Sequence, residues 1–222
     1  MKFYLACVLF VLCLSGFAQE QHVYNSKNLP KPDTTWVFAP KTFDKTQSLA
    51  VIFLLHGYSG NYKQWNGIMD AQKYADEYNM VIVCPDGMFS SWYLNSPVKP
   101  DWQYENFFFD ELFPDIKKRY NFDDKKVFIT GLSMGGHGAL VCALRNPGRY
   151  RSISAFSPIS NPMDCPWGEK AFSRYLGDDR ARWREWDASV LLAETPAGEC
   201  PPLLVDQGDR DDFLEKQLKP EA

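Results

Sequence analysis

The chain has 222 residues, of which 45% are hydrophobic and 23% charged, a balance typical of one ordinary globular domain. That composition excludes a disordered tail, a collagen-like fibre and a small disulfide-held domain. Lysine and arginine number 24 against 28 aspartate and glutamate residues, so the formal charge is −4, and no basic block interrupts the chain. A nucleic-acid partner is therefore not expected.

The first eighteen residues have the pattern of a secretory signal peptide. Lys2 precedes an apolar run over residues 3–14, and small residues lead up to the polar Gln19. The run is shorter than the roughly 20 residues that span a bilayer, which disfavours a permanent anchor helix. We expect cleavage after Ala18, one domain over residues 19–222, a secreted or periplasmic location and no stable membrane anchor.

Short apolar runs alternate with amphipathic stretches along the rest of the chain. The runs predict buried strands at residues 35–39, 50–55, 80–84, 127–130, 152–156 and 203–205. The amphipathic stretches predict helices at residues 62–78, 105–120 and 134–145. Strands and helices in this alternation form a mostly parallel sheet covered by helices on both faces. We expect a single α/β domain.

The segment from Gly131 to Gly135 fits the pattern G-x-S-x-G, with Ser133 at its centre, between a predicted strand and a predicted helix. In that setting the serine is held on a strained turn, and the glycines let the neighbouring backbones approach closely. Small residues also permit plain helix–strand packing, which is the structural alternative. The strand–turn–helix context favours a nucleophilic Ser133, with helix amides that stabilise negative charge on a substrate oxygen.

His56, Gly57 and Tyr58 follow the strand predicted over residues 50–55. A serine hydrolase of this architecture needs an amide from this loop, together with the amide after the nucleophile, to hold the oxyanion. The candidates are the N–H groups of Tyr58 and Met134. We expect His56 to be a structural histidine, because the general base comes from a later loop in the order Ser, Asp, His.

An acidic cluster follows the last predicted strand, with aspartates at positions 206, 209, 211 and 212. A loop after a strand downstream of the nucleophile is where a triad acid belongs. From the residues alone all four carboxylates remain candidates, and most members of such a cluster belong to a solvated loop or a helix cap. The spacing does not fit a calcium-binding loop.

The cysteines predict no metal site, because they form no C-x-x-C pair and have no histidine nearby in metal spacing. Cys84 and Cys142 fall in apolar segments and are expected to be buried. Cys165 and Cys200 flank loops and could pair in an oxidising compartment, which the sequence leaves open. No metal or organic cofactor is implied.

The motifs LLHGYSG, CPDG, GLSMGGHGAL, NPMDCPWGEKAF, YLGDD and DQGDRDDFL together resemble the esterase D / S-formylglutathione hydrolase family of α/β-hydrolases. The resemblance runs from about Trp36 to the end of the chain. It implies the α/β-hydrolase fold and a serine hydrolase that cleaves small-molecule, short-chain acyl esters or thioesters through an acyl-enzyme. It places the nucleophile at Ser133 and the triad acid at Asp211, three residues after the glycine of D-Q-G.

The catalytic histidine departs from the family pattern, in which it follows the acid within a G-Y-D-H-S-Y-like stretch. The histidines of this chain are His22, His56 and His137, and none matches that position. The simplest interpretation is an incomplete sequence that lacks the family's last strand, histidine loop and closing helix. The alternative is a catalytically silent binding protein of the same fold.

Trp92, Tyr93 and Trp102 lie in an irregular aromatic stretch after the strand at residues 80–84. These side chains either wall an acyl or aryl pocket or pack against the sheet. A secretory leader disfavours glutathione, a chiefly cytosolic thiol, whereas the CPWG and DQG motifs favour it. The substrate's leaving group and the oligomeric state are therefore left undetermined by the sequence.

Overall fold

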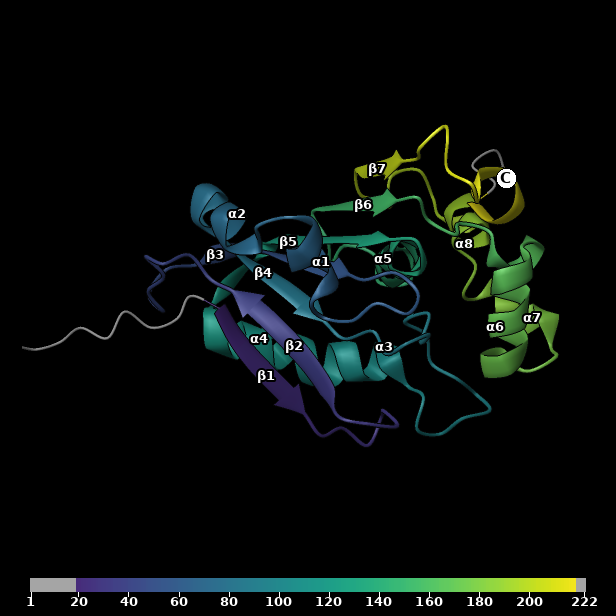
Figure 1. Ribbon diagram of the computed structural model, residues 1–222, viewed down its shortest axis with the longest axis horizontal. Coiled ribbons are helices and arrows are strands. Elements are labelled where there is room, and N and C mark those ends of the chain that lie inside the picture. Colours follow the sequence, from purple (N-terminus) through teal and green to yellow (C-terminus); the bar gives the residue numbers. More distant parts are fainter. Residues whose placement is uncertain (1–18, 219–222) are drawn as a thin grey trace, which may run out of the picture.

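A seven-stranded sheet in the order β1-β2-β4-β3-β5-β6-β7 organises the computed structural model, which describes residues 19–218 (Figure 1). The strands are β1 (Gln19–Tyr24), β2 (Asp33–Phe38), β3 (Leu49–Leu55), β4 (Met80–Pro85), β5 (Phe122–Leu132), β6 (Ser152–Phe156) and β7 (Leu203–Asp206). β1 and β2 are antiparallel to their neighbours, and the other five strands are parallel. This confirms the predicted α/β-hydrolase architecture.

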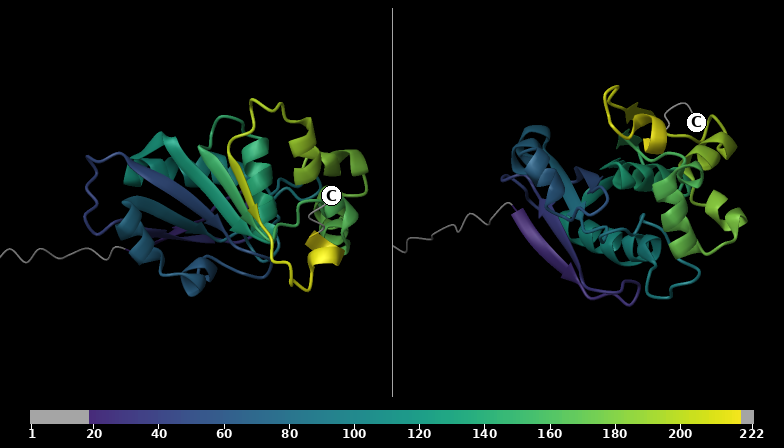
Figure 2. Two further views of the ribbon diagram at one scale, coloured as in Figure 1. Left: turned by 90° about the horizontal axis from the view of Figure 1, so that it is seen from above. Right: turned by 45° about the vertical axis from the view of Figure 1, so that its right-hand side comes forward.

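Helices cover the sheet on both faces. They are α1 (Gln64–Ile68), α2 (Ala71–Tyr78), α3 (Tyr104–Asn106), the π-helical η1 (Phe107–Leu112), α4 (Phe113–Tyr120), α5 (Met134–Leu144), the short η2 (Pro162–Asp164), α6 (Pro166–Leu176), α7 (Arg180–Arg184), α8 (Ala188–Glu194) and η3 (Leu214–Leu218). Figure 1 shows α2 and α4 on opposite sides of the sheet, and Figure 2 shows α6 to α8 gathered beyond the carboxyl end of β6. No helix within residues 19–218 has the length and apolar character needed to cross a membrane.

Two apolar cores lie on the two faces of the sheet, because successive strand residues point to opposite sides. Phe53 belongs to the larger core with α4 and α5, and its neighbour Leu54 belongs to the smaller core with α1 and α2. α5 is exceptional in that every one of its eleven residues is buried. The helix that follows the proposed nucleophile is therefore enclosed by protein on all sides.

The structure differs from the sequence prediction in three places. The helix predicted over residues 62–78 is two helices, because the Asp70 side chain caps the start of α2 by accepting from the Lys73 amide at 3.0 Å. Residues 19–24 form β1, which is not among the strands predicted from the sequence. The helices α6 to α8 were not predicted from the mixed, charged sequence after residue 161. The proposed signal peptide lies outside the described residues.

Candidate active site

Ser133 lies between the end of β5 and the start of α5, with φ 55° and ψ −114°. A non-glycine residue with this backbone is strained, and such strain persists only where the surroundings impose it. The Ser133 amide donates to the Phe156 carbonyl at 2.9 Å, and its carbonyl accepts from the His137 amide at 3.0 Å. The turn is thereby tied both to β6 and to α5.

Close backbone contacts explain the glycines around this turn. A Cβ on Gly131 would lie 2.0 Å from the carbonyl oxygen of Gly135, and a Cβ on Gly135 would lie 2.2 Å from that of Leu55. A Cβ on Gly57 would lie 3.6 Å from the Ser133 Cβ. The loop after β3 therefore runs directly beside the serine, as the G-x-S-x-G pattern predicts.

Side chains hold almost every polar backbone group of that loop. The Gly57 amide donates to Gln64 Oε1 at 2.7 Å, and the Tyr93 hydroxyl donates to the His56 carbonyl at 2.8 Å. Burial raises the pKa of Tyr93 well above its usual value, so the hydroxyl keeps the proton that it donates. The Trp65 indole N–H donates to the Leu55 carbonyl at 3.0 Å. The loop is fixed before any ligand arrives.

These bonds leave one amide of the loop available. The Ser59 amide donates to the Phe89 carbonyl at 2.9 Å and the Gly60 amide to the Gly57 carbonyl at 3.0 Å, while the structure describes no acceptor for the Tyr58 amide. Met134 is the first residue of α5, so its amide has no partner within the helix. Tyr58 and Met134 thus each carry an amide for which no acceptor is described, and their role as an oxyanion hole stays a prediction.

His56 has both ring nitrogens occupied. Its Nδ1 lies 2.7 Å from the Gly57 carbonyl oxygen, to which it donates, and its Nε2 accepts from the Gly87 amide at 2.7 Å. The ring is fully buried, and Asp86 Oδ1 lies 3.4 Å from Nε2. These contacts support the structural role expected for His56.

The other two histidines are also committed elsewhere. His137 Nε2 donates to the Trp186 carbonyl at 2.7 Å, and burial lowers the pKa of this histidine to about 4. His22 lies on β1, which β2, β4 and β3 separate from β5, and its Nε2 is 2.7 Å from the Tyr120 hydroxyl. Among the residues that the structure describes, no histidine ring is hydrogen-bonded to the Ser133 hydroxyl.

Asp211 lies in the loop after β7, on the same edge of the sheet as Ser133. It is half-buried, and its carboxylate accepts from the Phe213 amide at 2.9 Å, whereas the Asp206, Asp209 and Asp212 side chains are exposed. The structure does not bring Asp211 into contact with an imidazole. Its role as the triad acid stays a prediction.

The aromatic stretch after β4 is mostly core. Trp92 and Tyr93 are 2% and 4% exposed, and they pack against His137 and Tyr104. Trp102 stacks on Tyr175 with ring centroids 4.8 Å apart. The packing alternative therefore describes Trp92 and Tyr93 in this structure, and the role of the three residues in a substrate pocket stays a prediction.

Two residues near Ser133 were missed in the sequence. Gln64 holds the Gly57 amide, and the exposed Phe89 packs its ring edge to face against Tyr58. Nothing in a residue pattern marks a glutamine on a short helix or an aromatic residue in a loop as part of a site. Their positions depend on how the loops after β3 and β4 fold together.

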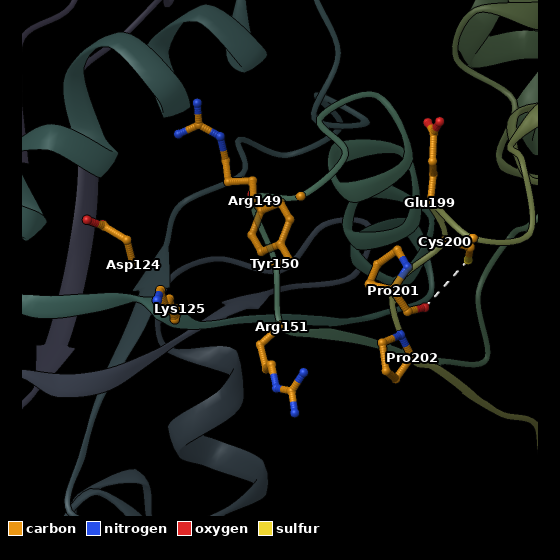
Figure 3. Close-up of a pocket in the computed structure, with 11 residues that line it drawn as sticks. Asp124, Lys125, Arg149, Tyr150, Arg151, Glu199, Cys200, Pro201 and Pro202 are labelled. Atoms are coloured by element: carbon orange, nitrogen blue, oxygen red, sulfur yellow. Dashed lines mark hydrogen bonds between the residues drawn. The ribbon is translucent and has the colours of Figure 1, made fainter.

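A separate pocket of about 350 Å³ lies at the amino ends of β6 and β7, opposite the edge that carries Ser133 (Figure 3). Arg149, Arg151 and Glu199 are among the side chains around it. The part of the chain that the structure describes contains no cluster of three or more metal-ligating side chains. The four cysteines within residues 19–218 form no disulfide, since Cys165 Sγ accepts from the Gly168 amide at 3.3 Å and Cys200 Sγ contacts the Pro201 carbonyl.

Comparison with known proteins matches residues 26–222 to a family described as "Putative esterase". An S-formylglutathione hydrolase from Agrobacterium tumefaciens is 32% identical, with a TM-score of 0.82 over 91% of this chain and 79% of that chain. Fluorophosphonate-binding serine hydrolase F of Staphylococcus aureus is 21% identical, with a TM-score of 0.75 over 89% of this chain and 82% of that one. At 21% identity, the second comparison shows that the two proteins share a fold.

Proposed function

We propose, from the premise that the chain belongs to this esterase family and is similar to the S-formylglutathione hydrolases, that Ser133 is the nucleophile of a serine esterase. The observation that carries the proposal is the strained turn that presents Ser133 next to the two available amides of Tyr58 and Met134. The Ser133 Oγ attacks the acyl carbonyl, and the two amides hold the negative oxygen of the tetrahedral intermediate. Collapse of this intermediate releases the alcohol or thiol and leaves an acyl-enzyme, which water hydrolyses to the carboxylic acid.

The proton of Ser133 must pass to a base and then to the leaving group. His22, His56 and His137 are each bonded to other groups, so we assign none of them as the base, and we assign to Asp211 the role of orienting the imidazole that acts on Ser133. The occupied histidines also favour a second candidate, a silent binding protein of this fold. The two candidates differ in whether Ser133 reacts.

The substrates that we propose are short-chain acyl esters or thioesters, and the similarity to an S-formylglutathione hydrolase supports thioesters. The sequence pattern of residues 1–18 supports a secreted or periplasmic location.

Chemical rescue by imidazole tests the assignment on the 222-residue chain. We expect at most trace hydrolysis of p-nitrophenyl acetate in buffer, and an increase with added imidazole that disappears in Ser133→Ala. Ser157→Ala is the matched control, because Ser157 also follows a strand with positive φ, at 43°. Mass spectrometry after fluorophosphonate treatment should find the adduct on Ser133. Rescue that survives Ser133→Ala, or an adduct on another serine, contradicts the assignment, and no reaction at Ser133 under either condition favours the silent protein.

A further inference from the structure

Two exposed aromatic rings, on the loops that follow β3 and β4, have no part in the chemistry above. Tyr58 and Phe89 are 54% and 58% exposed, and their rings meet edge to face with centroids 5.0 Å apart. Apolar side chains scattered singly over a surface are ordinary, whereas a contiguous apolar patch marks a binding site. This pair is contiguous, and it stands at the candidate active site.

The backbone fixes the pair next to the serine. Tyr58 directly follows Gly57, on which a Cβ would lie 3.6 Å from the Ser133 Cβ. The Phe89 carbonyl accepts from the Ser59 amide at 2.9 Å, so the loop after β4 is joined to the loop after β3. The loop that carries Tyr58 therefore passes directly beside Ser133, and the loop that carries Phe89 is joined to it.

Backbone strain occurs on both loops at the point where they meet. Ser59 has φ 59° and Met88 has φ 54°, a left-handed conformation that is unfavourable for side chains other than glycine. Strain of this kind clusters at ligand sites, where the surroundings over-determine it. Each ring thus has a strained residue next to it in the chain, and the hydrogen bond between the Ser59 amide and the Phe89 carbonyl joins the two loops.

We propose that Tyr58 and Phe89 form a platform that binds an aromatic ring of the ester substrate. The proposal deepens the function proposed above and rests on Ser133 being its nucleophile. A substrate ring packs against the platform in an offset-stacked or edge-to-face arrangement. Such aromatic contacts strengthen binding by a factor of about 2 to 12 beyond the effect of buried area. The ring can belong to the acyl part or to the alcohol part of the ester, because either one would make the same contact with the platform.

Two ketones that cannot be hydrolysed test the platform on the 222-residue chain. 4-Phenylbutan-2-one and 4-cyclohexylbutan-2-one differ only in the saturation of the ring, and NMR titration gives their dissociation constants. We expect tighter binding of the phenyl compound. Phe89→Leu, which keeps apolar volume but removes the ring, should reduce that preference by a factor of about 2 to 12, and Phe89→Tyr should restore it.

Tyr78→Ala is the matched control. Tyr78 is 62% exposed and stacks on Tyr74, but it lies just before the amino end of β4, away from Ser133. This variant should leave the ring preference unchanged. Equal affinities of the two ketones, or a preference that Phe89→Leu leaves intact, overturns the platform.

The products of ester cleavage show which part of the ester carries the ring. In 3-phenylpropanoate the ring belongs to the acyl part of the ester, and in benzyl alcohol it belongs to the leaving group. The platform binds the product whose affinity falls in the Phe89→Leu variant. Loss for neither product contradicts the platform. These measurements need no turnover, so they are separate from the reaction of Ser133 with fluorophosphonate. If the protein prefers the phenyl ketone but Ser133 does not react with fluorophosphonate, the esterase function is contradicted and the platform is a ligand-binding site. If Ser133 reacts but the two ketones bind equally, only the platform is contradicted.

Discussion

Replacing Gly135 by alanine should destabilise the protein, because the added methyl carbon has no room. Its Cβ would lie 2.2 Å from the carbonyl oxygen of Leu55 and 2.5 Å from that of His56, whereas real Cβ contacts essentially never fall below 3.0 Å. Both oxygens belong to the backbone at the end of β3, which pairs with a strand on each side. Neither oxygen can rotate away as a flexible side chain would.

The size of the effect follows from this geometry. α5 and β3 would have to separate by about 0.8 Å to relieve the contact with Leu55. Since α5 is buried along its whole length, the shift would disturb packing on every side of it. Overpacking of this kind destabilises by about 1–3 kcal/mol and occasionally more, against about 1 kcal/mol gained from the better helix propensity of alanine. Because two backbone oxygens would lie closer than 3.0 Å, we take the upper end of the overpacking range, about 3 kcal/mol, and expect a net loss of about 2 kcal/mol and a Tm lower by about 4–8 °C.

Urea denaturation followed by circular dichroism measures the loss. Gly67→Ala is the matched control, because Gly67 lies in α1 and a Cβ at this position would have nothing within 4 Å. That variant should be as stable as the original chain or more stable by up to about 1 kcal/mol. A Gly135→Ala protein whose free energy of unfolding stayed within about 0.5 kcal/mol of the original would refute the overpacking argument. It would mean that α5 does not lie as close to β3 as the structure places it.

Three further predictions concern the support of the site. Gln64→Leu removes the acceptor of the Gly57 amide. The variant should lower kcat for imidazole-assisted hydrolysis by at least about tenfold with little change in KM, and an unchanged kcat would show that Gln64 does not position the loop. Tyr93→Phe leaves the buried His56 carbonyl without its donor and should cost about 1–3 kcal/mol in urea denaturation, whereas unchanged stability argues against this bond. Burial lowers the pKa of His137 to about 4 from 6.5, so the unfolded chain binds more protons between these values and stability should fall as the pH drops from 6.5 to 4. The His137→Asn variant should show a weaker dependence of stability on pH over this range. Equal pH dependence in the two proteins would refute the assignment of the effect to His137.

Local patterns predicted most of the sheet and the central part of the site. The runs that became β3, β4 and residues 127–130 of β5 are buried or half-buried throughout, so they stand out as largely apolar segments, and β6 has buried residues at alternate positions. Ser133 and its turn were predictable because the close contacts that require glycine lie within a few residues of it. In each of these cases, residues close together in the sequence determine the local structure.

The remaining parts depend on contacts between distant residues. β1 is an edge strand with mostly exposed side chains, so it lacks an apolar signal and forms because β2 supplies its hydrogen bonds. Trp92 becomes a core residue because α5 brings His137 and α6 brings Phe172 against it. Gln64 and Phe89 acquire their positions from the meeting of two loops. Aromatic residues in a loop therefore cannot be divided into core and binding residues from the sequence.

The enclosure of α5 has a consequence for the motion of the candidate nucleophile. Local opening requires a segment with few buried contacts, and a helix buried at all eleven positions offers none. The amides in the middle of α5 should therefore exchange with deuterium only through global unfolding, and Ser133 at its start inherits that rigidity. The entropy lost in positioning the Ser133 backbone is then lost when the chain folds, and substrate binding does not have to offset it.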